Sequence, residues 1–302
     1  MDFLFAVIDL GSNSVRMSIN RLCSGKSWRV EKKLRETVRL SEGMGKDNYL
    51  KEEAMERVID ALGRFCKIAA EYQCVSIAAI ATAAVRNAAN KDLFLARVKE
   101  RTNISLEVIS GEEEAYYSYL AVRETIGITD GVIFDTGGGS TEIALVKGGD
   151  IQERISLPLG AVVLTERMAH STQTQLYKYV SSYIGAISWL DKCQSLPFYA
   201  IGGSARTLAM IYKKRLLTNE ELDGLKIPYS SVCKVYQSIF NTSPEQRRDI
   251  KGMDVSRADI ILAGLTPAKV LMDMTGSEKL IVCASGVKEG VFFRMKDEIS
   301  GR

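Results

Sequence analysis

Two segments of this sequence, about 126 residues apart, share one layout. "FAVIDLGSNSVRMSIN" (5–20) and "GVIFDTGGGSTEIALV" (131–146) each run from an apolar, strand-like stretch through D-x-G-x-x-S into a second strand-like stretch. The matching positions are Asp9 with Asp135, Gly11 with Gly137, and Ser14 with Ser140. Because a whole supersecondary unit recurs, the sequence indicates two related domains, which we expect at 1–126 and 127–302.

Strand-like and helical stretches alternate along the rest of the chain, which predicts an α/β fold with sheets covered on both faces. In 51–72 the apolar positions recur with the period of an amphipathic helix. Asn90 is a plausible N-cap, and Pro267 is expected to open a second helical segment within 255–274. Further strands are predicted at 75–84, 105–110 and 198–201, and further helices at 90–101, 111–127 and within 160–195.

Net charge, the N-terminal pattern and the content of cysteine and histidine argue against several classes of protein. The 302 residues carry a net charge of only +3, which argues against a nucleic-acid or membrane partner. The first residues lack the pattern of a signal peptide, so we expect a cytoplasmic protein. The six cysteines form no CxxC pair and are expected to be reduced, and His170, expected on the surface, is the only histidine, which disfavours zinc.

The glycine-rich loops suggest a site for anions. A strand that turns through glycine leaves backbone N–H groups pointing outward, and such a nest binds phosphate oxygens. The expected groups are Asp9, Gly11, Ser12, Asn13 and Ser14 in the first loop and Gly137, Gly138, Gly139, Ser140 and Thr141 in the second. The alternative is a tight β-hairpin with a glycine bulge, and the loop alone does not decide between the two.

Two carboxylates flank the second loop. Asp135 ends the incoming strand and Glu142 leads the returning one. Carboxylates beside a phosphate repel it unless a cation lies between them, and magnesium is usually held by one or two carboxylates together with substrate phosphate. We therefore predict a magnesium (or manganese) site at these two acids. One loop in each domain, facing a shared cleft, implies a substrate with more than one phosphate.

With both loops in view, the chain resembles the exopolyphosphatase / guanosine pentaphosphate phosphohydrolase (Ppx/GppA) family. The resemblance covers nearly the whole chain and rests on "DLGSNSVR", "ATAAVRNAAN", "VISGEEEA", "DTGGGSTEI", "AIGGSARTLA", "SRADIILAG" and "ASGVKEG". It implies two ribonuclease-H-like domains of the actin and sugar-kinase type flanking a cleft, in the short form that lacks a C-terminal His-Asp domain. It also implies metal-dependent removal of the terminal phosphate of inorganic polyphosphate or of the 5′ γ-phosphate of guanosine pentaphosphate. Family members are often homodimers.

The resemblance also implies residue roles. Glu113 matches the catalytic glutamate, with Glu112 and Glu114 as register alternatives, and Asp135 and Glu142 match the metal-site acids. The arginines that match phosphate-binding positions are Arg16, Arg86 and Arg257. "DTGGGS" has Thr136 where isoleucine or valine is common in the family.

Several of these residues have a purely structural alternative. Ser110-x-x-Glu113 is a capping-box pattern, so Glu113 could simply cap a helix. The stretch Gly202–Ser204 could be a third anion or nucleotide loop, or could let the following helix approach the sheet. The basic runs 213–215 and 247–248 are expected to be solvated, with a track for a long polyanion as the alternative. Alternative functions are an ATP-dependent kinase or ATPase of the same fold, and a non-catalytic sensor of polyphosphate or nucleotide.

Overall fold

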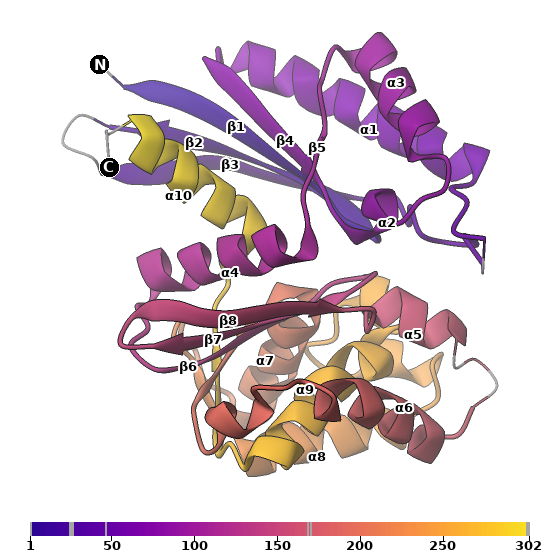
Figure 1. Ribbon diagram of the computed structural model, residues 1–302, viewed down its shortest axis with the longest axis vertical. Helices are drawn as coiled ribbons and strands as arrows, with labels where there is room; N and C mark the ends of the chain where they lie inside the picture. Colours follow the sequence, from indigo (N-terminus) through magenta and orange to yellow (C-terminus); the bar gives the residue numbers. More distant parts are fainter. Residues whose placement is uncertain (1, 24–26, 46, 168, 170, 300–302) are drawn as a thin grey trace. The chain divides into compact units, whose positions relative to one another are not determined.

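The computed structural model describes residues 2–23, 27–45, 47–167, 169 and 171–299, so that His170 lies outside the described residues. The chain forms two compact units (Figure 1). Unit 1 runs to Tyr117 and also contains the chain from Val287 onward, and unit 2 is Ser118–Gly286. We describe each unit by itself.

Unit 1 is built on a five-stranded sheet in the order β3-β2-β1-β4-β5. β1 and β4 are parallel, as are β4 and β5, while β1, β2 and β3 form an antiparallel meander. The strands are β1 (Phe3–Leu10), β2 (Ser14–Leu22), β3 (Trp28–Thr37), β4 (Ser76–Ala81) and β5 (Glu107–Val108). The helices are α1 (Glu52–Glu71), α2 (Ala83–Arg86), α3 (Lys91–Thr102), the first part of α4 (Gly111–Thr125) and α10 (Val287–Ile299).

Unit 2 repeats this arrangement on a six-stranded sheet in the order β10-β11-β9-β6-β7-β8. The strands are β6 (Gly131–Thr136), β7 (Thr141–Lys147), β8 (Asp150–Leu157), β9 (Phe198–Ile201), β10 (Lys226–Pro228) and β11 (Lys279–Val282). The helices are α5 (Ala161–Arg167), α6 (Gln173–Gly185), α7 (Gly202–Leu216), α8 (Tyr229–Phe240) and α9 (Ile261–Thr275), with short 3-10 turns η1 (Leu190–Cys193), η2 (Gln246–Asp249) and η3 (Val255–Arg257).

The two sheets correspond strand by strand. In each unit an antiparallel meander of three strands (β1-β2-β3, β6-β7-β8) is joined through its first strand to a parallel strand (β4, β9). The internal repeat predicted from the sequence is therefore a structural repeat, and the α/β fold class is confirmed.

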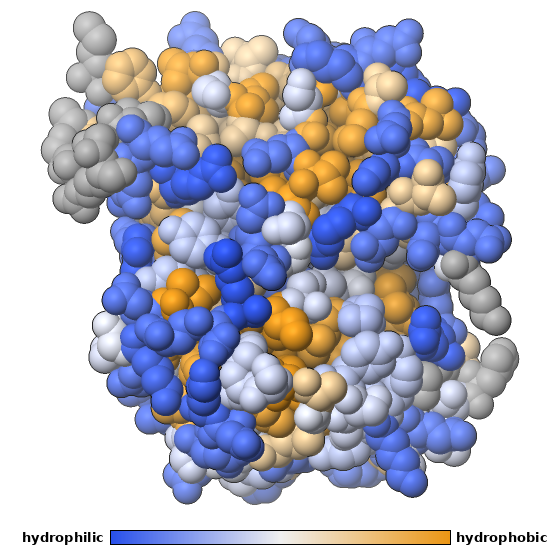
Figure 2. Space-filling model, in the orientation of Figure 1, coloured by the Kyte–Doolittle hydropathy of each residue, from blue (hydrophilic) through white to orange (hydrophobic). Residues whose placement is uncertain are grey.

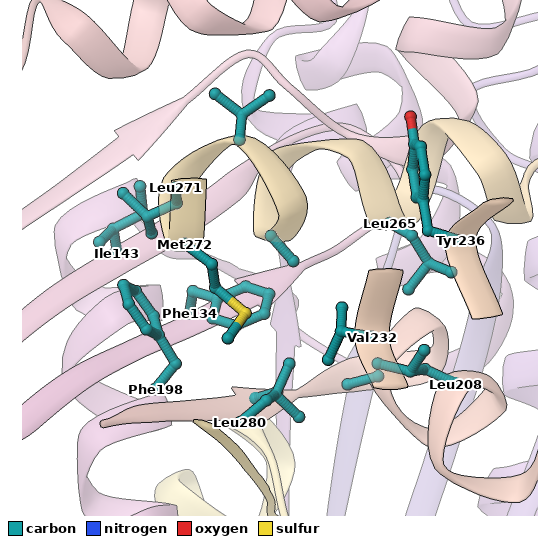
Figure 3. Close-up of a cluster of buried hydrophobic side chains, with 14 of the residues drawn as sticks. Phe134, Ile143, Phe198, Leu208, Val232, Tyr236, Leu265, Leu271, Met272 and Leu280 are labelled. Carbon is teal, nitrogen blue, oxygen red and sulfur yellow. The ribbon is translucent and has the colours of Figure 1, made fainter. Parts of the chain in front are cut away.

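The core of each unit lies between its sheet and the helices that cover it. In unit 1, α1 packs on the face to which Ile8 and Leu10 point, and α10 packs against β1 and β2 on the other face (Figure 1). In unit 2, side chains from the sheet meet α7, α8 and α9 in a continuous apolar cluster (Figure 3). There the Phe134 and Phe198 rings lie edge to face with centroids 6.1 Å apart, which fixes the strand directly before Asp135.

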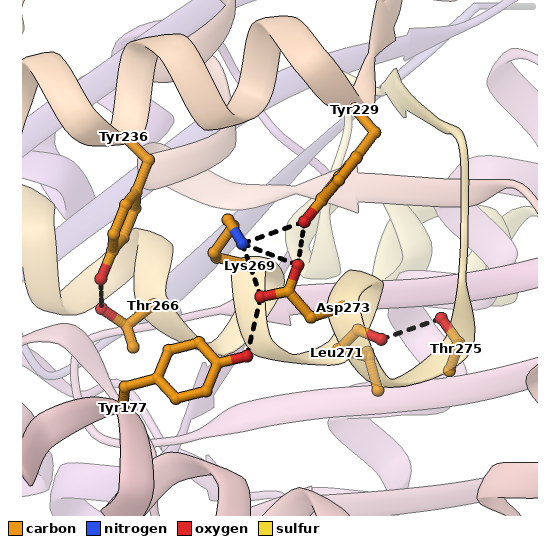
Figure 4. A network of polar contacts seen from close by, with 8 residues as sticks. All are labelled: Tyr177, Tyr229, Tyr236, Thr266, Lys269, Leu271, Asp273 and Thr275. Carbon is orange, nitrogen blue, oxygen red and sulfur yellow. Dashed lines mark hydrogen bonds and ion pairs between the residues drawn. The ribbon is translucent and has the colours of Figure 1, made fainter. Parts of the chain in front are cut away.

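A polar network ties three helices of unit 2 together (Figure 4). Lys269 and Asp273 of α9 form an ion pair at 2.5 Å. Tyr177 of α6 donates to the Asp273 carboxylate at 2.7 Å, and Tyr229 of α8 donates to the same carboxylate. Burial and these hydrogen bonds raise the pKa of both tyrosines. The phenols therefore stay protonated as donors, and the network holds α6 and α8 on α9.

The structure corrects two expectations about chain organisation. The expected boundary near residue 126 is replaced by a division within α4, and α10 belongs to unit 1, because its side chains cover β1 and β2 there. Pro267 does not open a new segment but lies inside α9, a helix buried along much of its length. A buried helix keeps its course through one missing hydrogen bond when packing on several sides supports it.

Three predictions about single residues have different outcomes. Gly127 ends α4 as predicted, with φ +74° and its N–H donated to Val122. Asn90 precedes α3, but its side chain bonds the backbone of Leu50 instead of capping the helix. Arg247, expected on a solvated face, is buried and donates to the carbonyls of Ile239 and Thr242, because the turn after α8 needs these acceptors satisfied.

On the face drawn in Figure 2, hydrophilic residues are interspersed with smaller hydrophobic groups. Within the described residues, no helix combines the length and the apolar character that crossing a membrane requires. The six cysteines are all free thiols, as expected.

Candidate phosphate and metal site

The first loop is a tight turn between β1 and β2. The N–H of Gly11 donates to the carbonyl of Ser14 at 3.1 Å, which closes the turn. The carbonyls of Ser12 and Asn13 accept hydrogen bonds from the backbone of 38–41, the segment that follows β3. The carbonyl groups of this loop are thereby hydrogen-bonded inside unit 1.

The second loop has the same construction. Gly137 donates to Ser140 at 2.9 Å, and the carbonyls of Gly137 and Gly138 accept at 2.9 Å from the first N–H groups of α5. None of the three consecutive glycines has a left-handed backbone. Close approach does account for neighbouring Gly160, since a Cβ there would lie 2.3 Å from the Gly138 carbonyl oxygen. The hairpin and the anion-nest interpretations thus describe the same loop.

Donors at both loops are left uncommitted. The N–H groups of Ser12, Asn13, Gly138 and Gly139 donate to no backbone acceptor among the described residues. In the first loop, the buried Ser12 Oγ, Asn13 Nδ2 and Arg16 Nε likewise have no hydrogen-bond partner in the part of the chain that the structure describes. Buried donors are rarely left unpaired unless a ligand or water completes them, so this loop has the character of an anion site.

The residues beside the two loops differ in charge. Asp9 lies opposite Arg16 in the β1–β2 pair, and Asp135 lies opposite Glu142 in the β6–β7 pair. Directly opposed like charges destabilise a hairpin, which a cation between Asp135 and Glu142 would offset. One oxygen of Glu142 already accepts from Ser156 at 2.7 Å, which orients this carboxylate.

These acids fit magnesium or manganese. Both ions prefer oxygen ligands, and magnesium is commonly held by one or two carboxylates with water and substrate phosphate. No group of three or more potential protein ligands occurs among the described residues. A metal ion held at these two acids would take its remaining ligands from phosphate and water oxygens. The Thr141 hydroxyl is used elsewhere, because it donates to the Leu159 carbonyl at 2.8 Å.

The glycines at the start of α7 make room for two functional side chains. Gly202 has φ +87°, and a Cβ there would lie 2.3 Å from Asp135 Oδ1. A Cβ on Gly203 would lie 2.0 Å from the guanidinium of Arg257, which is only 5% exposed. Asp135 and Arg257 are therefore brought together at the N-terminus of α7, a position that favours anions. This close approach accounts for the Gly-Gly pair.

In unit 1, Arg86 is placed near the first loop by backbone contacts between strand ends. Thr82, which precedes α2, donates to the carbonyl of Leu10 at the end of β1. Arg86 Nη1 donates to the carbonyl of Ile109 at 2.9 Å and to Glu114 at 3.1 Å. Glu114 is buried in this ion pair, which makes it a partner of Arg86.

Glu113 forms the capping box that its spacing predicts. The Ser110 N–H donates to the Glu113 carboxylate at 2.7 Å, and the Glu113 N–H donates to Ser110 Oγ at 3.1 Å. The side chains of Glu112 and Glu113 are both exposed, unlike that of Glu114. A capping carboxylate keeps a second oxygen for other contacts, so the cap and a catalytic role are compatible.

Comparison with known proteins identifies the family. The model of the Ppx/GppA phosphatase family matches residues 24–299. The chain belongs to this family. The family resemblance that the motifs indicated is thereby confirmed.

Relatives and a solved structure agree with this assignment. The chain is 32% identical over 93% of its length to a bifunctional 3-dehydroquinate synthase/phosphatase of Fusobacterium nucleatum, and 29% identical over 98% to a guanosine-5′-triphosphate,3′-diphosphate pyrophosphatase of Photobacterium profundum. It spans 45% and 60% of these two relatives. An exopolyphosphatase from Cytophaga hutchinsonii has the same fold, with a TM-score of 0.90, 24% identity and 98% of both chains covered.

Sequence reasoning missed several supporting residues. Ser156, the register partner of Glu142 on β8, and Gly160 beneath the second loop carry no motif of their own. The ion pair of Arg86 with Glu114 joins residues 28 positions apart and follows only from tertiary structure. The spacing of "GEEEA" on a helix could have signalled that adjacent glutamates point to different sides.

Proposed function

We propose that this chain is a metal-dependent phosphatase that removes the terminal phosphate of inorganic polyphosphate, of guanosine pentaphosphate, or of both. The observation that carries the proposal is the pair of equivalent loops, each with its carbonyl groups bonded inside its unit and its N–H groups uncommitted. Membership of the Ppx/GppA phosphatase family supports it. Each loop suits a phosphate group.

Asp135 and Glu142 would hold magnesium or manganese, which supplies charge neutralisation at the phosphate oxygens when bound. Arg16, Arg86 and Arg257 would bind phosphate with planar, bidentate donors. Because Arg257 is buried beside Asp135 and the start of α7, its guanidinium has little freedom. It would therefore bind phosphate with little loss of side-chain entropy.

Glu113 would act as the general base that orients and deprotonates the attacking water. Its exposure and its place at the first turn of α4 support this role over Glu114, whose carboxylate is bound to Arg86. The Gly202–Gly203 pair, covered by the side chains of Asp135 and Arg257, supports a hydrolase over an ATP-dependent kinase that would place adenosine there.

The substitution Glu113→Gln separates the base from the cap. Glutamine still completes a capping box but cannot accept a proton as a base. We expect E113Q to keep the stability of the wild type within about 0.5 kcal/mol and to lose turnover by roughly 10²–10⁴-fold. Ser110→Ala measures the cap by itself and should cost about 1 kcal/mol of stability.

The assay is phosphate release from tripolyphosphate, long-chain polyphosphate, guanosine pentaphosphate and ATP, each with magnesium, with manganese and with EDTA. Release from the polyphosphates, from guanosine pentaphosphate or from both is expected in the presence of metal. Release from ATP far faster than from the others would favour the kinase-like alternative. No release from any substrate, or an E113Q variant as active as the wild type, would refute the proposal or the role of Glu113, respectively.

A further inference from the structure

The first turn of α10 carries a buried ion pair that has no place in the site described above. Lys288 and Glu289 are only 7% and 5% exposed, and Lys288 Nζ donates to Glu289 Oε1 at 2.5 Å. Lys33 on β3, which is 59% exposed, reaches the same oxygen at 3.8 Å. Buried charges are costly and can often be replaced by apolar side chains without loss of stability. Stability alone therefore does not account for this ion pair.

The pair lies against the sheet face that carries the charged residues of the first loop. Side chains alternate across a strand, and Ile8 and Leu10 belong to the core on the α1 side. Asp9 between them therefore points to the opposite face, where α10 packs against β1 and β2 (Figure 1). The same alternation places Arg16, between core residues Val15 and Met17, on this face.

Lys288 thus has carboxylates on two elements. One is Glu289 on its own helix, and the other is Asp9, a buried residue at the end of β1. Burial lowers the pKa of Lys288, while the negative charges of Glu289 and Asp9 oppose that effect. Lys288 belongs to the helix that packs against β1 and β2, on the face to which Asp9 points.

Other contacts of unit 1 fix α10 in place. A Cβ on Gly290 would lie 1.9 Å from the carbonyl oxygen of Tyr117, so the two helices touch through their backbones. Arg294 donates to the Tyr117 hydroxyl, and Trp28 of β3 packs its ring edge-on against Phe293 at 5.0 Å. The helix that carries Lys288 is therefore held firmly within unit 1.

From this arrangement we infer that Lys288 is a positioning residue for the first phosphate loop. It draws the Asp9 carboxylate toward α10 and offsets its negative charge, so that Arg16, directly opposite Asp9, keeps its own charge for substrate phosphate. Without Lys288, the Asp9 carboxylate would compete for Arg16 and repel the anion. The inference rests on the proposed function, because it assigns that loop to phosphate.

The test compares four variants with the wild type. Lys288→Met removes the charge at similar length, Lys288→Arg restores it, and Lys33→Met is the matched control that removes the exposed lysine on the same glutamate. The double variant Lys288→Met with Glu289→Leu replaces the whole pair by apolar side chains, which keeps the fold without an unpaired buried charge. Each is assayed for kcat and KM on tripolyphosphate with magnesium and for its urea midpoint.

We expect KM to rise about tenfold in K288M and in the double variant, with kcat within threefold of the wild type, because the loop binds ground state and transition state alike. K288R should recover most of the affinity, and K33M should stay within twofold of the wild type. If the Lys288–Glu289 pair only stabilised the fold, the result would differ. The double variant would then regain the wild-type KM, and this outcome overturns the inference.

A cycle with Asp9→Asn gives an independent check. If Lys288 acts through Asp9, K288M should change KM by less than threefold in the D9N background, since residues that act through one contact are not additive. A full tenfold effect in that background contradicts the inference. The wild type is assayed in parallel to distinguish failure of the proposed function from failure of the inference about Lys288. If the wild type releases no phosphate, the proposed function fails. Thermal stabilisation of the same variants by tripolyphosphate then decides the role of Lys288.

Discussion

Replacing Gly290 by alanine tests how the C-terminal helix is seated in unit 1. Gly290 lies in the interior of α10, where alanine would ordinarily add about 1 kcal/mol of helix stability. Here its Cβ would lie 1.9 Å from the carbonyl oxygen of Tyr117 on α4, whereas ordinary contact begins at 3.4 Å. One helix would have to move by roughly 1.5 Å to relieve the overlap. Since the obstacle is backbone, no rotamer change can relieve it.

Overpacking of this kind costs about 1–3 kcal/mol, and the gain in helix propensity offsets part of it. Because the obstacle is backbone at 1.9 Å, we take the upper part of that range, about 2–3 kcal/mol, so that after a gain of about 1 kcal/mol G290A is expected to be about 1–2 kcal/mol less stable than the wild type. The matched control is Gly63→Ala in α1, where a Cβ would meet nothing within 4 Å. G63A should be more stable by about 0.5–1 kcal/mol.

The assay is urea unfolding followed by tryptophan fluorescence. The chain has two tryptophans, Trp28 in unit 1 and Trp189 in unit 2, so a Trp189→Phe background leaves Trp28 to report on unit 1. Trp28 also contacts Phe292 and Phe293 of α10 directly. If G290A matched or exceeded the wild-type midpoint while G63A behaved as expected, the close contact between α10 and α4 would be refuted.

Three further predictions address the site and the core. Gly203→Ala should raise KM, because its Cβ would displace the Arg257 guanidinium 2.0 Å away, and an unchanged KM contradicts this. The substitution should also cost about 1–3 kcal/mol of stability through overpacking, because this guanidinium is buried. EDTA should stop phosphate release, and activity that persists in EDTA would exclude the metal at Asp135 and Glu142. Glu142→Gln should raise the magnesium concentration needed for half-maximal activity tenfold or more. Burial raises the pKa of the Cys193 thiol from 9.0 to about 11. As the pH rises, the unfolded chain therefore loses this proton before the folded one, and the free energy of unfolding should fall between pH 9 and 11. The urea midpoint of Cys193→Ala should fall less steeply in that window, and equal slopes would contradict the assignment.

The features that the sequence predicted well are those set by local chemistry. Each repeat contains a strand, a turn closed by a glycine N–H onto a serine carbonyl, and a returning strand, and all three are encoded within 16 residues. The opposition of Asp135 and Glu142 follows from the length of that turn. For the same reason Ser110 and Glu113 could be foreseen as a capping box.

Features that depend on distant parts of the chain escaped prediction. The pattern of α10 predicts a helix but contains no information about which sheet it covers, so its return to unit 1 was not foreseen. The burial of Arg247 depends on the acceptors that the preceding helix leaves open. The purpose of Gly203 became clear only with Arg257, 54 positions later, lying against it.

The difference between the two repeats explains how one loop design can serve two tasks. Both loops expose N–H groups in the same way, but the residue opposite the strand-end aspartate is Arg16 in one and Glu142 in the other. The first pair sets a guanidinium beside the loop, whereas the second sets two carboxylates opposite each other, whose repulsion a cation would offset. A phosphate at the first loop would thus be met by protein donors alone, and one at the second by a metal ion. Under the proposed function, a single change of charge at one register position, on a backbone that is otherwise repeated, would add a metal ion to phosphate binding at the second loop.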